Sequence, residues 1–403
     1  MKGMSQNAIE SWSLNEVRMV RETVSIDITS LIQTMIVEED IEQGLLRGTL
    51  TFIDAMNITE SLDMKGEEYL FISFNSFDHD LSEKDPYAKL FRIYSYMELT
   101  EQNLGTRRAV QLYFCTPAEV YNELCNIRKS YKNASSNQIV KEMLEILKVE
   151  SDTFVEDTLF MKDLIIPGIT PLETISFMAK TSISKDTGDS NFYFFENRYG
   201  IHFQSGVTLM KDEPFEYVVE GTNPTDMQMY HKISNYQRVK GYDVLESYAS
   251  GAIGVNMMMR DGLRKGYREE PVSFDSLKGQ YAMLNSSPTI VSPKEVKGAR
   301  QHLISTEQMY QFNNKSSYGN MTAIREINRN SLYTKRSLIS CAGDSDVGVG
   351  KIIDLKVLNQ NGQISVVDSG KWLVAKCRHV IDVNAGRYTQ EMEIISDSNI
   401  TRD

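Results

Sequence analysis

Apolar residues recur at every second position over about residues 18–116, and few folds accommodate that pattern. The clearest runs cover residues 24–28, 50–52, 70–74 and 110–114. Alternation places one face of a strand on a core and leaves the other face polar. Turn residues such as the Lys65-Gly66 pair separate the runs. The segment therefore predicts an antiparallel meander, a barrel or a sandwich.

The pattern becomes helical at Thr116-Pro117, a pair that suits a helix N-cap followed by proline at the first helical position. A second helix is predicted near Ser136, where apolar residues follow i, i+3, i+4 spacing. A third begins at residues 170–173, which read as a capping box. Two aromatic-rich runs around Asn197-Arg198 then predict a short hairpin. Residues 117–229 are thus expected to form an inserted α+β domain.

Two segments show a faint internal repeat. Gly44 precedes Asp54 by ten positions, and Gly251 precedes Asp261 by the same interval. In both segments two apolar residues follow the glycine, and apolar residues lie four and two positions before the aspartate. The match is either chance or the trace of a duplicated β domain whose second copy begins near residue 230.

The second copy, if it exists, is interrupted. Residues 271–327 are polar and irregular, and strand patterns resume beyond residue 328. The predicted fold is mainly β with α+β insertions, with two antiparallel β-barrel domains from an internal duplication. Its expected parts are a first barrel (18–116), an inserted domain (117–229), a second barrel (230–270 and 328–398) and an irregular insertion within that second barrel (271–327).

Charge and cysteine content restrict the partners. Lys and Arg number 43 and Asp and Glu number 55, for a net charge of −12. Such a surface does not attract nucleic acid or anionic lipid by simple charge. The sequence has no apolar run of the roughly 18 residues that a membrane span requires, so membrane insertion is not expected.

Four cysteines without CxxC spacing predict reduced, mostly buried thiols in a protein folded in a cytoplasm: Cys115, Cys125, Cys341 and Cys377.

No constellation of catalytic, cofactor-binding or metal-binding residues is predicted. The triplet Asp186-Thr187-Gly188 matches that of aspartic proteases, but it is a single copy in a polar segment, which favours a loop. Residues 344–346, Asp-Ser-Asp, could hold a cation through oxygen ligands, although the nearby glycines favour a turn.

The five histidines, at positions 79, 202, 231, 302 and 379, are too far apart in sequence to form a helical zinc pair. His379 falls in a strand pattern, where a structural imidazole is expected. The run Met257-Met258-Met259 has two interpretations, ordinary strand residues or a pliable subunit interface.

In these features the chain resembles the baseplate hub proteins of contractile-tailed bacteriophages, typified by the T-even phage hub. It also resembles the hub-forming N-terminal part of type VI secretion spike proteins. The more specific matching pieces are the aromatic hairpin at residues 192–203 and the C-terminal block containing Gly370-Lys371-Trp372, His379 and Gly386-Arg387-Tyr388. Pattern-level matches are the 44–54 strand, Lys65-Gly66-Glu67 and Thr170-Pro171-Leu172.

The resemblance implies a homotrimer in which each chain contributes two tail-tube-like barrels, so that six similar barrels form a ring. Such a ring adapts a sixfold tail tube to a threefold central spike and forms part of the channel through which DNA passes. The implied partners are the central spike protein, the tail tube or tube-initiator proteins, and other baseplate (wedge) proteins. The implied location is the tail baseplate of the virion, assembled in the host cytoplasm. Because the chain stops at Asp403, the spike is expected to be a separate polypeptide.

Two other functions remain open. A tail-tip cell-wall hydrolase would need paired carboxylates or a His/Cys/Asp set in one cleft, and the sequence suggests neither. A tail-tip receptor- or partner-binding protein would use the 271–327 insertion.

Overall fold

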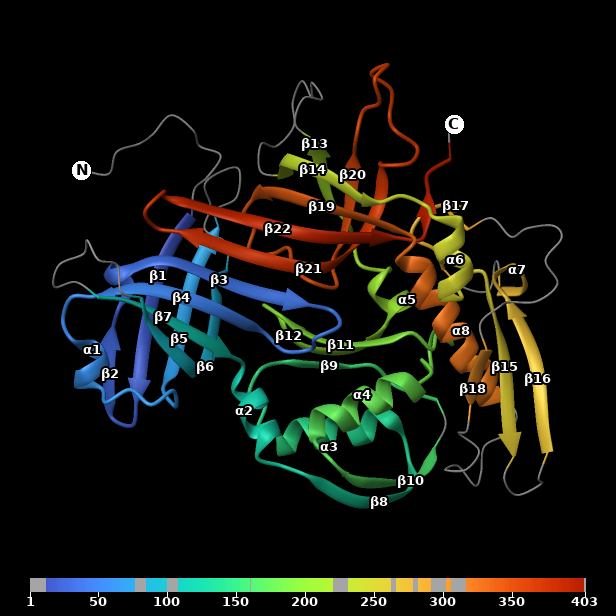
Figure 1. The fold of residues 1–403 in the computed structure, drawn as a ribbon, viewed down its shortest axis with the longest axis horizontal. Helices are drawn as coiled ribbons and strands as arrows, with labels where there is room; N and C mark the ends of the chain where they lie inside the picture. The colour runs from blue at the N-terminus through green and yellow to red at the C-terminus, as the bar shows by residue number, and fades with distance from the viewer. Residues whose placement is uncertain are drawn as a thin grey trace.

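The computed structural model describes residues 12–76, 85–99, 108–159, 161–219, 231–261, 266–277, 282–290, 302–305 and 317–401. Strands dominate it, and one sheet of 13 strands runs through both halves of the chain (Figure 1). Apart from one short helix at Ile58–Ser61, the described α-helices lie in the inserted segments.

The first half of the large sheet comes from seven strands: β1 (Trp12–Arg21), β2 (Val24–Asp27), β3 (Ile32–Asp40), β4 (Arg47–Asp54), β5 (Tyr69–Ser76), β6 (Tyr87–Leu99) and β7 (Arg108–Cys115). Their order in the sheet is β2-β1-β5-β6-β7-β4-β3. A 3-10 turn (η2, Thr29–Leu31) precedes β3, and a short helix (α1, Ile58–Ser61) follows β4. The alternation over residues 18–116 therefore predicted these strands correctly.

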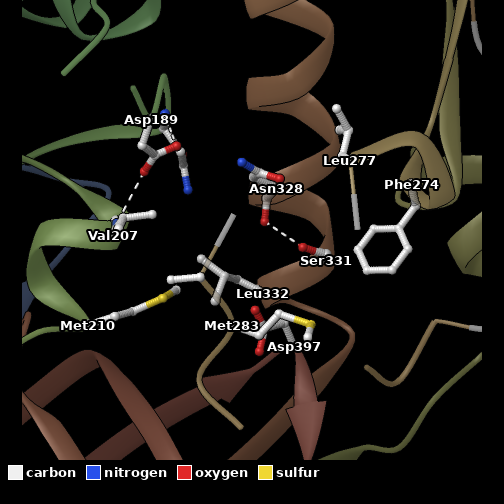
Figure 2. Close-up of a pocket in the computed structure, with 13 residues that line it drawn as sticks. Asp189, Val207, Met210, Phe274, Leu277, Met283, Asn328, Ser331, Leu332 and Asp397 are labelled. Atoms are coloured by element: carbon white, nitrogen blue, oxygen red, sulfur yellow. Dashed lines mark hydrogen bonds between the residues drawn. The ribbon is translucent and has the colours of Figure 1, made fainter. Parts of the chain in front are cut away.

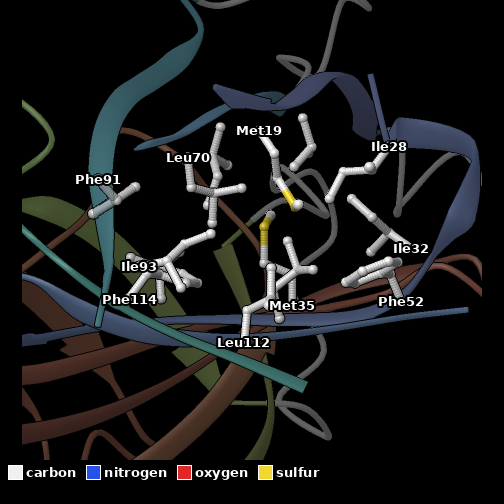
Figure 3. Packing of buried hydrophobic residues seen from close by; sticks show 14 of the residues in the cluster. Met19, Ile28, Ile32, Met35, Phe52, Leu70, Phe91, Ile93, Leu112 and Phe114 are labelled. Carbon is white, nitrogen blue, oxygen red and sulfur yellow. The ribbon is translucent and has the colours of Figure 1, made fainter. Parts of the chain in front are cut away.

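The sheet curls around one apolar core. Figure 3 shows side chains from β1, β3, β4, β5, β6 and β7 meeting there, with Met19 and Met35 at the centre. Both methionines are fully buried, as are Leu50, Leu70 and Leu112. In β4, β5 and β7 alternate residues enter this core, which explains the period of two in the sequence.

The second half is a closed barrel of six strands: β13 (Phe215–Val219), β14 (Lys232–Lys240), β19 (Lys335–Ala342), β20 (Ile352–Lys356), β21 (Gly370–Asp382) and β22 (Arg387–Ser396). Their order is β21-β20-β13-β14-β19-β22, and the pairing of β21 with β22 closes the ring. Trp372 and its neighbours fill the interior. The β-barrel fold class predicted from the sequence is confirmed.

The two halves share one topology. The strands β3-β4-β7-β6-β5 are adjacent in that order, and the strands β14-β19-β22-β21-β20 repeat it. All of these neighbours are antiparallel in both halves. Two register shifts also recur: between Ile32 and Thr34 as between Ile233 and Asn235, and between Ile93 and Ser95 as between Val374 and Lys376. Since chance rarely reproduces order, direction and bulges together, the topology supports an internal duplication.

The sequence repeat that suggested this duplication was nevertheless misassigned. β15 (Gly254–Asp261) does not occupy the position of β4; it pairs with β16 (Gly266–Ser273) and β18 (His302–Ser305) in a separate three-stranded sheet. The true counterpart of β4 is β19. A period of two specifies a strand but not its sheet, so the Gly-to-Asp spacing recurred by chance.

The parts of the chain also divide differently from the predicted boundaries. The insertion between β14 and β19 covers residues 241–334, which is wider than the predicted 271–327, and β13 lies in the second barrel rather than in the 117–229 unit. Besides β15, β16 and β18, the insertion holds α6 (Val244–Ser250), α7 (Phe274–Leu277), β17 (Ser287–Pro288) and α8 (Ser317–Leu332). β17 pairs with β23 (Ser398–Asn399) near the C-terminus.

The first inserted unit contains nine elements: α2 (Pro117–Glu123), β8 (Ile127–Ala134), α3 (Ser136–Ile146), β9 (Thr153–Val155), β10 (Lys162–Ile169), α4 (Pro171–Thr181), β11 (Phe192–Asn197), β12 (Gly200–Ser205) and α5 (Gly206–Leu209). In Figure 1, α3 and α4 lie between the β8–β10 ribbon and the sheet of β9, β11 and β12. The predicted capping box is present: the Glu173 amide donates to Thr170 Oγ1 at 3.3 Å, and the Thr170 amide donates to Glu173 Oε2 at 2.9 Å. The α+β character and the aromatic hairpin were thus predicted correctly.

Candidate functional site

The curled sheet of the first half and the closed barrel of the second half, called the first and second barrels from here on, join where β3 pairs with β21. The register runs antiparallel from Asp40 opposite Lys376 to Thr34 opposite Asp382. Ion pairs reinforce this register on the outer face: Lys376 Nζ lies 3.0 Å from Asp40 Oδ2, and Arg378 Nε lies 3.0 Å from Glu38 Oε1. The junction is therefore a continuous sheet rather than a contact between two separate surfaces.

A buried carboxylate lies on the inner face of this junction. Glu39 is 2% exposed, and its Oε2 accepts a hydrogen bond from the Val349 amide at 2.8 Å. Its Oε1 lies 3.4 Å from His379 Nε2. A Cβ on Gly348 would lie 2.4 Å from Glu39 Oε2, so a larger residue there would displace the Glu39 carboxylate. Glu39 thereby links the first barrel to the β19–β20 loop of the second.

His379 is part of a buried polar network. Its Nδ1 lies 2.8 Å from the Tyr388 hydroxyl and 3.2 Å from Gln390 Nε2. The Cys377 thiol lies 3.6 Å from His379 Nε2. Burial raises the pKa of Cys377 well above its usual range, which disfavours the nucleophilic thiolate. The Cys–His pair is therefore suited to packing rather than to covalent catalysis, and the structural interpretation of His379 fits its surroundings.

The β19–β20 loop (residues 343–351) is held from three sides. The Ser345 amide donates to Ser76 Oγ of the first barrel at 2.9 Å. Arg198 of the aromatic hairpin pairs with Asp346. Gln390 of the second barrel accepts from the Asp344 amide at 3.0 Å. The loop thus connects both barrels and the inserted unit.

Asp344 and Asp346, which the sequence left as a possible cation site, already have protein partners. Asp344 Oδ2 lies 3.0 Å from His231 Nε2, and its Oδ1 accepts from the Asp346 amide at 2.9 Å. Among the described residues, no group of three or more His, Cys, Asp or Glu side chains could hold a metal ion. The turn interpretation of this segment fits these contacts.

The aromatic hairpin reaches the first barrel through Glu196. This carboxylate is 2% exposed, lies 3.1 Å from Lys89 Nζ and accepts a hydrogen bond from the Thr116 hydroxyl. The sequence reasoning missed both Glu196 and Glu39. Each is a charged residue at a position where the two-residue alternation of its strand predicts a buried apolar side chain. That mismatch could have identified both residues from the sequence.

The remaining candidates lie apart from the junction or outside the described side chains. Residues 186–188 form a turn in which the Asp186 and Thr187 amides donate to Ser184 Oγ. His202 stacks on Phe195 with ring centroids 4.8 Å apart and bonds Asn197. His79 and the side chains of His302 and of Met257 to Met259 lie outside what the structure describes.

One small cavity, of about 40 Å³, lies where the first inserted unit, the second insertion and the C-terminus meet (Figure 2). Two buried carboxylates line it, and burial raises the pKa of both Asp189 and Asp397. Asp189 accepts from the Val207 amide at 3.1 Å, and Asp397 accepts from the Leu284 amide at 3.2 Å. Apolar side chains such as Met210 and Leu332 cover the rest. These carboxylates serve as internal acceptors for backbone amides.

No helix of the described chain is both long and apolar enough to cross a membrane.

Comparison with known proteins gives a consistent result. No family model matches the chain. The probable baseplate hub protein gp334 of Vibrio phage KVP40 is 20% identical over 415 aligned residues, which cover 98% of this chain and 97% of that protein.

Solved structures share the fold. The tail protein from Neisseria meningitidis MC58 superposes with a TM-score of 0.58 at 9% identity, covering 95% of this chain and 96% of that one. A chain of the half-lidded Francisella PdpA-VgrG complex gives a TM-score of 0.56 at 9% identity, covering 99% of this chain and 60% of that one. The chain therefore has the fold of a tail protein, and its resemblance to the baseplate hub proteins of contractile-tailed phages, first indicated by its sequence motifs, is confirmed over nearly its whole length.

Proposed function

We propose that this protein is the structural baseplate hub of a contractile phage tail. The observation that carries the proposal is the duplicated barrel: two units of the same strand order in one chain, fused by the β3–β21 junction. A threefold assembly of such chains would present six similar barrels. It would match a sixfold tail tube on one side and a threefold central spike on the other.

The similarity to a probable baseplate hub protein over almost the full chain supports this role. The proposed partners are two further copies of the chain, a central spike protein, tail tube or tube-initiator proteins and wedge proteins. The proposed location is the baseplate of the virion, after assembly in the host cytoplasm. We propose a structural role without catalysis, because the groups that could supply chemistry at the junction are buried and engaged with one another.

The net charge of −12 fits a channel that DNA crosses without binding. An acidic lumen repels phosphate, whereas a lumen lined with Lys and Arg would retain it. We expect a structure of the assembled hub to show excess carboxylates along the lumen. A basic lumen would rule out this part of the proposal.

The mass of the purified chain in solution, measured by light scattering after size exclusion, tests the proposed assembly. A species near three times 46.0 kDa supports the ring of six barrels. A monomer that persists at high concentration, with saturable binding to host cells, would instead favour the receptor-binding alternative.

A further inference from the structure

The junction inside the chain can be repeated between chains, because the duplication gives each partner strand a counterpart. β3 corresponds to β14, and β21 corresponds to β6. If β3 of one barrel pairs with β21 of the next barrel within the chain, then β14 is the strand suited to pair with β6 of another copy. This inference rests on the proposed ring and identifies the surfaces that would close it.

Part of the β6 strand has an edge that no described strand covers, at the place where the proposed ring requires a contact. β6 and β21 are both 13 residues long. The first part of β21 pairs with β20, whereas residues 376–382 pair on the same edge with β3. β6 pairs with β5 through residues 87–92, but no described strand pairs with that edge of β6 beyond Ile93. We call residues 94–99 the β6 edge.

The counterpart strand is equally unpaired. β14 pairs with β19 along one side, and on its other side it meets β13 only at Lys232 and Ile233. No described strand pairs with the rest of that side. We call residues 234–240 the β14 edge. In β3 the corresponding edge, residues 34–40, is fully paired with β21.

Side-chain exposure agrees with missing neighbours at both edges. Tyr94 is 49% exposed and Tyr96 is 38% exposed at the β6 edge, whereas their counterparts at the internal junction, Ala375 and Cys377, are buried. At the β14 edge the Arg238 side chain is 45% exposed, whereas its counterpart Val37 is fully buried. Free strand edges that carry apolar and tyrosine side chains are templates for pairing with another chain.

The matching bulges fix the register. Aligning Ser95 with Lys376 through their bulges places Glu98 at the position of His379. Aligning Asn235 with Thr34 places Arg238 at the position of Val37. Because Val37 lies opposite His379 in the chain, Arg238 of one copy falls opposite Glu98 of the next. Opposite charges directly across an antiparallel pair are favourable. Within the chain Arg238 already pairs with Asp368 and Glu98 lies 3.8 Å from Arg108, so the contact would extend existing ion pairs.

We propose that the β6 edge pairs antiparallel with the β14 edge of a second copy, with Glu98 opposite Arg238. The two edges are different surfaces, so the contact is head-to-tail, and such contacts form a closed ring when the rotation between copies closes. Main-chain hydrogen bonds would supply much of the affinity, as in other cases of strand addition. Each barrel of the ring would then meet the next through the same kind of sheet.

Engineered cysteines test the register directly. Directly opposed residues in antiparallel strands have Cα atoms about 4.5–5.5 Å apart, within the range of a disulfide. The double variant Glu98→Cys, Arg238→Cys is made in a Cys125→Ser background, because the other native thiols are buried. Oxidation should yield covalent oligomers on a non-reducing gel. The controls are the two single variants and the off-register pair Ser95→Cys, Arg238→Cys. None of these controls should yield the covalent oligomers.

An interface substitution provides the second test. Tyr96→Glu places a charge at the position of the buried Cys377, and Met161→Glu is its control, because Met161 is 53% exposed on the inserted unit. We expect Tyr96→Glu to raise the concentration needed for assembly by about tenfold or more while the control assembles normally. Circular dichroism of both variants shows that each is folded.

The outcomes separate this inference from the proposed function. Oligomers that form without the Glu98–Arg238 cross-link, and that tolerate Tyr96→Glu, overturn the strand pairing but leave the hub proposal standing. A wild-type chain that remains monomeric at high concentration overturns the ring itself. A cross-link to another tail protein in place of a second copy would show that the edge serves a different partner, and would also refute the proposal.

Discussion

At the scale of single residues, the junction depends on buried polar groups that are matched to one another. Glu39 accepts from the Val349 amide and faces His379, while its neighbour Glu38 points outward to Arg378. Adjacent residues of one strand thus have opposite environments, because side chains alternate between the two faces.

This contrast gives a first prediction. Glu39→Ala leaves the buried Val349 amide without its acceptor and removes the carboxylate beside His379, so we expect it to lower the free energy of unfolding by about 1–3 kcal/mol. Glu38→Ala removes one exposed ion pair and should cost less than about 1 kcal/mol. Urea denaturation of both variants measures the difference. Equal losses would mean that the buried carboxylate does not stabilise the junction.

A second prediction concerns pH. Burial raises the pKa of Asp397 above that of an unfolded chain, so the folded state holds a proton that the unfolded state releases. The stability that Asp397 contributes is therefore present at low pH and is lost as pH rises through its raised pKa. Asp397→Asn keeps an acceptor for the Leu284 amide and removes this loss.

The stability of Asp397→Asn relative to wild type should accordingly increase as pH rises from about 4. Urea midpoints measured between pH 4 and pH 8 would test this, with the exposed Asp275→Asn as the control. A constant difference across that range would argue against a raised pKa at Asp397.

At the scale of elements, tight turns decide how the β19–β20 loop reaches its partners. Gly350 has φ +83°, and a Cβ there would lie 2.4 Å from the Phe195 ring of the aromatic hairpin. Gly362, in the loop between β20 and β21, has φ +74° and nothing within 4 Å of a Cβ. Both positions strain an L-residue, but only the first also creates a clash.

The difference between Gly350 and Gly362 gives a third prediction. Gly362→Ala should cost about 1 kcal/mol through backbone strain alone. Gly350→Ala should cost about 3 kcal/mol or more, because it also displaces a buried ring. Thermal unfolding of the two variants isolates the clash. If both lost the same stability, the packing of Phe195 against the loop would not limit this position.

At the scale of the whole molecule, one sheet extends through both barrels, so they should unfold together. The chain has two tryptophans, and each reports on one barrel: Trp12 packs against the first core, and Trp372 fills the second. Trp12 also donates to the Gly386 carbonyl in the β21–β22 turn at 3.0 Å, which ties the first strand to the second barrel.

The fourth prediction follows from this arrangement. In the single-tryptophan variants Trp12→Phe and Trp372→Phe, the fluorescence transition should coincide with the circular dichroism transition of the same protein. Separate midpoints in either variant would show that the barrels unfold independently and that the β3–β21 pairing couples them weakly.

Much of this architecture could be predicted from local patterns. Alternation identified strands such as β4, β5 and β7, and the Thr170–Glu173 box identified the start of α4, because these signals depend on neighbouring residues alone. The sequence motifs also indicated the resemblance to baseplate hub proteins.

Long-range pairing required the structure. The spacing from Gly251 to Asp261 looked like a repeat of that from Gly44 to Asp54, yet β15 lies in another sheet and β19 takes the place of β4. Nothing in the sequence near Glu39 indicates that it meets His379, 340 positions further along the chain.

The sequence by itself determined the strands, the helix starts, the acidic balance and the family resemblance, since each depends on composition or on short-range periodicity. Only the tertiary structure decided which strands are equivalent, where the two barrels fuse and which edges remain free. A strand's partners are set by the global closure of sheets, and side-chain alternation carries no information about which edge lies beside which.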